Sequence, residues 1–323
     1  MYGYTIFHED ILKTLIDSVR DGRNANTYIF EGGKELGVEN AAMLFASALL
    51  CMNSKNAPCG SCGPCMETSS GANPDLIHLS KQKDKATIGV DLVRDVVLSS
   101  AIEKPIYSKR KVFIINDGDI LTAGAQNAML KMLEEPPEYA VFIIICENSM
   151  SILETVRSRS VIVAFRPVSD NIVRKYITEK YPDIDGLDFL VRFCAGMPMV
   201  ADKIAEREDF GELREETLNL VPKLLTSNKF HSFAFAEYFD KHKDNAVEIC
   251  DLILMYLRDA LVTSMGGYDI INIDKREKIN ILASKYSARI ITEGADEMIT
   301  AKKMIQKYVK PSAAAMHAAL SVG

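Results

Sequence analysis

The sequence predicts an α/β domain followed by an all-α region. In the first half, short apolar runs alternate with helical patterns, which indicates βαβ units and a mostly parallel sheet. Strand signals stop after Phe165, and from about residue 209 onward the apolar residues recur with helical spacing. A chain of 323 residues is long enough for two or three domains. We therefore expect an α/β domain over 1–165, a small helical domain over 166–208 and a larger helical domain over 209–323.

The elements of the first domain follow from these runs. Five apolar runs are predicted to be strands: 27–31, 76–79, 111–116, 140–146 and 161–165. Four stretches between them have helical spacing: 9–19, 38–50, 90–101 and 123–134. Pro136 and Pro137 should end the last of these helices, because proline cannot continue a helix.

The helical half is divided by a Gly-Met-Pro break. Gly196-Met197-Pro198 is expected to separate two short helices. Longer helices are predicted where the periodicity is clearest: 213–225, 246–265 and 290–309.

Composition and charge narrow the classes of function. A hydrophobic fraction of 48% with 25% charged residues is ordinary for a globular protein. The net charge of −6 argues against a surface broadly committed to nucleic acid, so any DNA contact should be local. The longest apolar run, VFIIIC, is too short to cross a membrane, and the start MYGYTIFHED has no export-signal pattern. We expect a cytoplasmic protein without a membrane partner.

The segment YIFEGGKELGVENAA has the layout of a phosphate-binding loop. Gly32 and Gly37 have the required separation between a strand and a helix start. A working loop continues with a lysine that neutralises phosphate and a hydroxyl that holds magnesium, but this chain has Val38 and Glu39 there. Glu39 would repel phosphate at the helix start, and the spacing does not let Lys34 replace the missing lysine. The loop is predicted to be a degenerate phosphate loop that binds nucleotide at most weakly and gives no ATP turnover.

The strand expected at 111–116 lacks the acids that complete an ATPase site. Such a strand normally ends in a magnesium-binding acid, followed by a glutamate that orients water. In KVFIINDGD these positions hold Asn116, a neutral amide, and Asp117, which is one methylene shorter than glutamate. We therefore expect neither ATP as a cofactor nor intrinsic ATPase activity.

Four cysteines have the spacing of a metal site. Cys51, Cys59, Cys62 and Cys65 form the pattern C-x7-C-x2-C-x2-C in CMNSKNAPCGSCGPC. Thiolates suit tetrahedral zinc, and the alternative of free or redox thiols fits the spacing less well. Four protein ligands leave no open position, so the zinc should be structural. Three further cysteines stand singly in apolar contexts and are expected in the core: Cys146, Cys194 and Cys250.

The turn ETVRSRS carries two arginines between expected strands. The planar fork of an arginine suits the spread charge of a phosphoryl transition state, and it can be supplied to a neighbour's site. A solvated salt bridge or helix cap is the alternative for Arg157 and Arg159, and spacing alone favours that alternative. The basic stretch KPIYSKRK could likewise meet a phosphate backbone, but a solvated entrance to a strand is favoured.

Several segments occur together and in order along nearly the whole chain. They are IFHEDILKTLIDSVRDGRNANTYIFEG, the loop GGKELGVENAA, the cysteine segment, NPDLIHL, KVFIINDGDILTAGAQNAMLKMLEEPPEYAVFIII, the SRS turn and YLRDALVTSMGG. In this combination the chain resembles the clamp-loader proteins of the AAA+ family, and among them the delta-prime subunits of bacterial DNA polymerase III. No single segment is specific, but LEEPP, the SRx turn and the cysteine knuckle are specific together.

The resemblance implies an AAA+ module with a zinc knuckle and a small helical lid, followed by a helical collar for oligomerisation. It implies a pentameric ring with gamma/tau and delta subunits that loads the sliding clamp onto primer–template DNA during replication. Delta-prime members commonly lack a working phosphate loop, so the resemblance also explains why the fold is kept without the chemistry.

The resemblance assigns a role to one arginine. Ser158-Arg159-Ser160 matches the family's Ser-Arg-Cys turn, so Arg159 is expected to be an arginine finger that acts in trans on a neighbouring ATPase subunit. Serine replaces the usual cysteine at 160, but the cysteine is not the charged group. The lid arginine of ATPase members has no counterpart in GMPMVADK, where Met199 lies near its place.

Two other functions compete with this one. An ATP-hydrolysing gamma/tau-type clamp-loader subunit would share the fold, the knuckle and the SRx turn, but Val38, Glu39 and Asn116 argue against it. A stand-alone zinc-containing scaffold would make Arg159 incidental.

Overall fold

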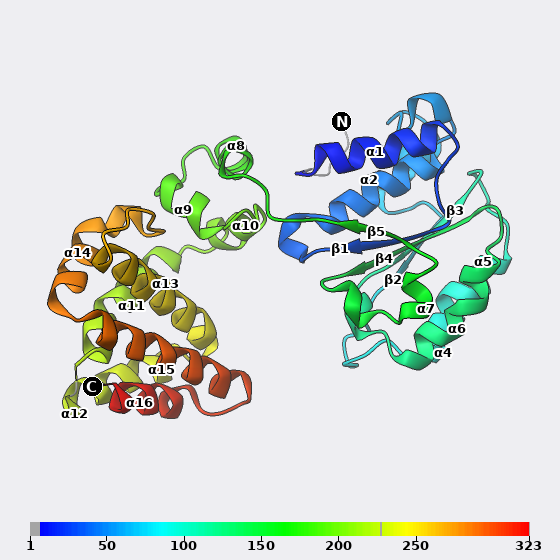
Figure 1. Cartoon of the computed structure of the whole chain (residues 1–323). Coiled ribbons are helices and arrows are strands. Elements are labelled where there is room, and N and C mark those ends of the chain that lie inside the picture. Colours follow the sequence, from blue (N-terminus) through cyan, green and yellow to red (C-terminus); the bar gives the residue numbers. More distant parts are fainter. Residues whose placement is uncertain (1–6, 227, 323) are drawn as a thin grey trace. The chain divides into compact units, whose positions relative to one another are not determined.

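The computed structural model describes residues 7–226 and 228–322, which divide into two compact units (Figure 1). The first unit extends to Val173 and also includes Gly196–Met199. The second contains Arg174–Ala195 and the chain from Val200 onward. Most of the helical residues expected in a small separate domain therefore group with the C-terminal helices, and the division into three domains remains a prediction.

The first unit has the α/β architecture predicted for an AAA+ module. All five predicted strands form, and they pair in parallel in the order β2-β3-β4-β1-β5. The strands are β1 (Thr27–Glu31), β2 (Leu76–Leu79), β3 (Lys111–Ile115), β4 (Ala140–Cys146) and β5 (Val161–Ala164). The helices are α1 (Glu9–Arg20), α2 (Val38–Leu50), α3 (Gly63–Ser70), α4 (Val90–Val93), α5 (Ser99–Ile102), α6 (Ala123–Glu134) and α7 (Glu154–Arg157). β3 and β5 each end one residue before the predicted end.

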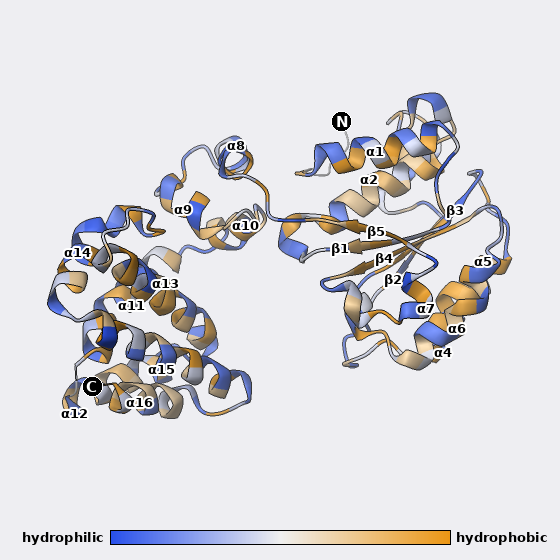
Figure 2. Cartoon of the chain, in the orientation of Figure 1, coloured by the Kyte–Doolittle hydropathy of each residue, from blue (hydrophilic) through white to orange (hydrophobic). Residues whose placement is uncertain are grey.

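Helices cover both faces of this sheet, so β3 and β4 are buried along their whole length and, apart from Lys111, are apolar (Figure 2). On one face, α1 and α2 pack against inward side chains such as Phe30 and Ile143. On the other face, α4, α5 and α6 cover Ile29 and Phe142. Two apolar cores thus sandwich the sheet and fix the positions of the loops at its edges.

The helix predicted over 90–101 is interrupted by a π-helical turn, Arg94–Leu98, between α4 and α5. The extra residue in that turn changes the inward face. Val93, Val97 and Ala101 are fully buried, whereas Val96 is only half-buried. The prediction of one regular helix over 90–101 is therefore wrong in its middle turn.

A buried carboxylate holds the loop between α5 and β3. Asp75 has no solvent exposure, and its two oxygens accept the backbone N–H groups of Ile106, Tyr107 and Ser108 at 2.6, 2.8 and 2.7 Å. Three donors to one carboxylate satisfy a charge that would otherwise be costly to bury. The same bonds fix the basic stretch that begins at Lys104.

The second unit is all-α, as predicted for the C-terminal half. Its core joins side chains from α11 to α16, including Phe235, Phe239 and Leu257. The helices that follow β5 are α8 (Asp170–Lys180), α9 (Leu187–Phe193), α10 (Val200–Ala205), α11 (Phe210–Leu224), α12 (Lys229–Lys241), α13 (Ala246–Ser264), α14 (Arg276–Lys285), α15 (Ala288–Gln306) and α16 (Pro311–Ser321). α9 and α10 are separated at the predicted Gly-Met-Pro break.

One arginine connects α9 to the larger helical core. The guanidinium of Arg214 lies 3.4 Å from the centroid of the Phe189 ring and donates two hydrogen bonds to Asp274. Nearby, the buried Asp259 accepts the backbone N–H groups of Ile271 and Asn272. These contacts explain why α9 belongs to the same compact unit as α11.

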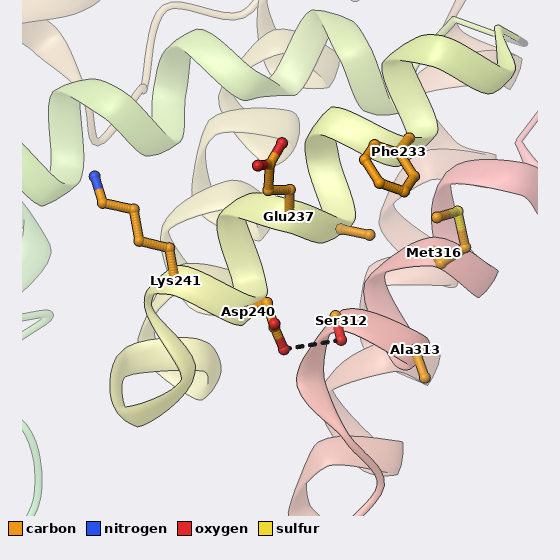
Figure 3. A pocket seen from close by; sticks show the side chains of 8 residues that line it. Phe233, Glu237, Asp240, Lys241, Ser312, Ala313 and Met316 are labelled. Carbon is orange, nitrogen blue, oxygen red and sulfur yellow. Dashed lines mark hydrogen bonds between the residues drawn. The ribbon is translucent and has the colours of Figure 1, made fainter.

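A groove of about 620 Å³ opens between α12 and α16 (Figure 3). Phe233 and Met316 form its apolar wall, and Asp240 accepts a hydrogen bond from Ser312 at its floor. Phe233 is 63% exposed, so this wall faces solvent in the isolated chain.

None of the described helices is long and apolar enough to cross a membrane.

Replacing Asp75 should destabilise the first unit. Asp75→Ala removes three charge-assisted hydrogen bonds, and we expect it to lower the free energy of unfolding by about 3 kcal/mol in urea denaturation. The control is Asp84→Ala, at an exposed position in the loop after β2. Equal urea midpoints for the two variants would contradict the assigned role of Asp75.

Candidate functional site

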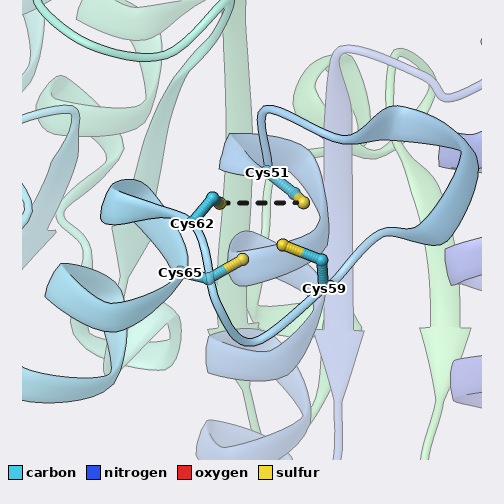
Figure 4. Close-up of side chains that lie close together, drawn as sticks. All are labelled: Cys51, Cys59, Cys62 and Cys65. Atoms are coloured by element: carbon cyan, nitrogen blue, oxygen red, sulfur yellow. Dashed lines mark hydrogen bonds between the residues drawn. The ribbon is translucent and has the colours of Figure 1, made fainter.

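The four predicted cysteine ligands converge on one point (Figure 4). Cys51 follows α2, Cys59 lies in the next loop, and Cys62 and Cys65 belong to the start of α3. Their sulfur atoms all lie within 4.8 Å of one another, and the sulfurs of Cys51 and Cys62 are 4.0 Å apart. Zinc–sulfur bonds of 2.3 Å in a tetrahedron put sulfurs about 3.8 Å apart, so the cluster could hold a zinc ion.

The surroundings of the thiols also fit a cation. Backbone N–H groups of Ser61 and Cys62 lower the pKa of Cys59 to about 6, so this ligand is a thiolate at neutral pH. Burial raises the pKa of Cys51 to about 12 and also raises that of Cys65. A bound cation would offset this effect by stabilising the thiolate forms.

The glycine loop between β1 and α2 has the predicted tight shape. A Cβ on Gly32 would lie 3.0 Å from Cβ of Phe165 and 3.1 Å from a methyl group of Val38, so a side chain does not fit there. Gly37 has φ 75°, the left-handed conformation that glycine adopts without strain. Val38 is the first residue of α2 and is completely buried in the core. The valine in the lysine position therefore serves packing.

In this structure the side chain of Lys34 is paired with acidic residues of the same chain. Its Nζ donates a 2.8 Å hydrogen bond to Asp117 and lies 4.0 Å from Glu39. The hydrogen bond to Asp117 raises the pKa of Lys34, which keeps it charged. The Asn116 side chain donates to the hydroxyl of Ser80. The loop thus contains a cation already paired with the acid that follows β3.

The two arginines of the SRS turn make different contacts. Arg159 forms a 2.7 Å ion pair with Glu134, the last residue of α6. Its Nη1 also donates to the backbone carbonyl of Thr155 at 2.8 Å. Arg157 instead places Nη1 2.7 Å from the sulfur of Met150. The salt bridge considered from the sequence is therefore present for Arg159 in the isolated chain.

A buried glutamine connects α6 to the segment that leads into this turn. The Gln126 side chain accepts the backbone N–H of Leu153 at 2.7 Å and donates to the carbonyl of Leu121 at 3.1 Å. Val156 is buried beside it in the same core. These contacts hold the turn with Arg159 against α6.

The sequence identified the groups of this region but missed some of their partners. It brought the four cysteines together, and it placed Gly32, Gly37, Val38 and Glu39 in one loop. It missed the pairing of Lys34 with Asp117 and that of Arg159 with Glu134. The acidic residues in NDGD and LEEPP are the only sequence signal for these ion pairs. Their spacing from Lys34 and Arg159 does not predict which acid pairs with which cation.

Comparison with known proteins shows two family matches. The family described as DNA polymerase III, delta subunit, matches residues 7–169, and its C-terminal counterpart matches residues 208–311. The chain is 29% identical over 308 residues to DNA polymerase III subunit delta' of Bacillus subtilis, covering 93% of this chain and 91% of that protein. It is 26% identical to the Escherichia coli subunit delta', covering 84% of this chain and 80% of that protein.

The similarity to tau subunits is confined to about half of the chain. The Bacillus subtilis subunit tau is 31% identical over 166 residues, which are 51% of this chain and 29% of that protein.

The cysteine cluster gives a direct test by metal analysis. We expect the purified chain to carry one zinc ion, and Cys62→Ser to lose it and unfold the first unit at lower urea. Structural zinc sites have apparent binding energies on the order of 10 kcal/mol, so the loss should be large. Cys250→Ala, in the second unit, should keep the zinc. A metal-free chain with undiminished stability under reducing conditions would contradict the assignment.

Proposed function

This chain belongs to the DNA polymerase III delta subunit family, and we propose that it is the delta' subunit of a clamp loader. In this role it assembles with gamma/tau and delta subunits in a pentameric ring that loads the sliding clamp onto primed DNA during replication. The observation that carries the proposal is similarity to delta' proteins over 93% of the chain, combined with a phosphate loop in which Val38 stands where lysine is needed.

The phosphate loop supports a subunit that does not hydrolyse ATP. A phosphate in the cradle would meet the carboxylates of Glu39 and Asp117, and the nearby Lys34 already pairs with Asp117. Val38 is buried in the core, so the usual lysine contact with phosphate is missing. The cradle then contributes shape to the assembly, and a neighbouring subunit performs the chemistry.

Arg159 is the group through which this chain would act on that chemistry. Its turn directly precedes β5, and its side chain is 37% exposed, within reach of a neighbouring subunit. A guanidinium supplied in trans stabilises the charge that develops on the transferred phosphoryl group. This chain would thus lend an arginine to a neighbour while lacking an active site of its own.

A gamma/tau-type ATPase subunit is the alternative. Similarity to the tau subunit covers only 51% of this chain, whereas similarity to delta' covers nearly all of it. The substituted phosphate loop also argues against an ATPase. We therefore favour the delta' function.

Each segment of the chain would have its own function in the assembly. We assign residues 1–165 to the AAA+ module, 166–208 to the lid and 209–323 to the collar that joins the ring. The second family match begins at residue 208, which supports a boundary there. The solvent-facing wall around Phe233 gives the collar an apolar surface for a partner subunit. Zinc on the four cysteines would be structural and would hold the knuckle.

The isolated chain should bind no ATP. We expect no magnesium-dependent binding at micromolar nucleotide in calorimetric titration and no turnover, with a gamma/tau subunit as the positive control. Lys34→Ala should leave this result unchanged, because Lys34 pairs with Asp117 and does not serve phosphate. Micromolar affinity that disappears in Lys34→Ala would show that Lys34 rescues the loop and would favour the gamma/tau alternative.

Removing Arg159 should impair a partner and leave this chain folded. In a complex reconstituted with gamma/tau and delta subunits, Arg159→Ala should reduce ATPase activity stimulated by clamp and primed DNA. Arginine fingers contribute roughly 10³–10⁵ in rate at the site they serve, and the total loss is smaller because the ring has several sites. Arg159→Lys should rescue only in part, because an ammonium lacks the planar fork.

Arg157→Ala is the matched control, since Arg157 lies in the same turn but contacts Met150. It should lower the stimulated rate much less than Arg159→Ala does. Normal assembly and an unchanged rate of clamp loading with Arg159→Ala would refute the trans-acting role.

A further inference from the structure

The guanidinium of Arg159 is held by two separate elements. From α6, Glu134 Oε1 lies 2.7 Å from Nη2 and forms an ion pair with it. From the turn itself, the carbonyl of Thr155 and the hydroxyl of Ser158 accept Nη1 at 2.8 and 3.3 Å. Contacts on both terminal nitrogens fix the plane of the fork as well as its position. An arginine held in this way is already oriented before a partner arrives.

Glu134 is well placed for this task. It is the last residue of α6, a helix anchored in the core by Met129 and Leu133 and followed by two prolines. A carboxylate at the negative end of a helix is locally unfavourable, so a cation beside it is stabilising. The pair therefore satisfies a charge on α6 and connects Arg159 to a rigid element.

The contacts leave part of the fork available. A guanidinium has five N–H donors, and the two hydrogen bonds to Thr155 and Ser158 both come from Nη1. Within residues 7–226 and 228–322, the Nε–H of Arg159 has no hydrogen-bond partner in the structure. A phosphoryl oxygen of a neighbour could bind this edge while Glu134 still holds the other.

We propose that Glu134 is a positioning residue for Arg159, a role that rests on the proposed function as a donor of an arginine in trans. It sets the direction of the fork that meets the neighbour's phosphoryl group. Thr155 and Ser158 contact only Nη1, so they would keep the guanidinium near the turn without Glu134 but would not fix the direction of Nη2. Removal of Glu134 should therefore slow the partner's chemistry by misaligning the fork.

The test uses the complex reconstituted with gamma/tau and delta subunits, clamp and primed DNA. Glu134→Gln should lower kcat for stimulated ATP hydrolysis by about threefold to tenfold at the served site, since small misplacements of an aligned group carry large kinetic penalties. KM for ATP should not change, because the arginine acts on the transition state. The matched control is Glu135→Gln, which makes the same charge change at an exposed neighbour and should keep the full rate.

A double-variant cycle separates positioning from a general structural effect. In the Arg159→Ala background, Glu134→Gln should cause no further loss of kcat, and its urea midpoint should match that of the unmodified chain. An equal loss in both backgrounds, or a kcat raised by Glu134→Gln alone, would overturn the positioning role. If Arg159→Ala leaves the stimulated ATPase rate unchanged, the proposed function as a donor of an arginine in trans is wrong. If Arg159→Ala lowers this rate but Glu134→Gln does not, only the positioning role of Glu134 is wrong.

Discussion

Parallel pairing of β1 with β4 on one side and with β5 on the other is the constraint on which the rest of the first unit depends. Because every strand runs in the same direction, the segments that follow β1, β3 and β4 all emerge at one edge of the sheet. Lys34 reaches Asp117 across this edge, although 83 residues separate them. Asp119 also accepts the backbone N–H of Glu147 there. Contacts between neighbouring loops thus connect the glycine loop to the segments that follow β3 and β4.

The sequence predicts features that depend on neighbouring residues well, and it predicts poorly those that depend on contacts between distant residues. β3 and β4 are buried along their whole length and read as nearly continuous apolar runs, and the partly exposed β2 and β5 are short apolar runs as well, so all five strands could be predicted. The cysteine cluster could also be predicted, because three of its four cysteines lie within a segment of seven residues. The π-helical turn Arg94–Leu98 depends on packing against the sheet and has no local signal. The contact of Arg214 with Phe189, like that of Arg159 with Glu134, depends on side-chain directions that periodicity does not reveal.

Val38 has a structural role at the position where a working phosphate loop has lysine. Its methyl group would lie 3.1 Å from a Cβ at position 32, and its side chain has no solvent exposure. A lysine at 38 would place its stem among these apolar side chains. A Cβ at Gly37 would lie only 2.9 Å from the ring of Phe7. The two glycines and the valine are therefore required by the packing of the first unit itself.

The register of β5 places the SRS turn and the glycine loop at opposite edges of the sheet. Val161 pairs with Tyr28 near the start of β1, so the turn with Arg159 lies at the amino edge of the sheet, while Gly32 follows β1 at the carboxyl edge. An arginine at one edge cannot serve a cradle at the other edge of the same molecule. Repeated contacts between unlike edges are heterologous, and they generate a directed ring when the rotation closes. Under the proposed function, a subunit without ATPase activity but with an exposed Arg159 would stand at one end of the catalytic order, because it would supply an arginine to a neighbour's site and would need none for its own.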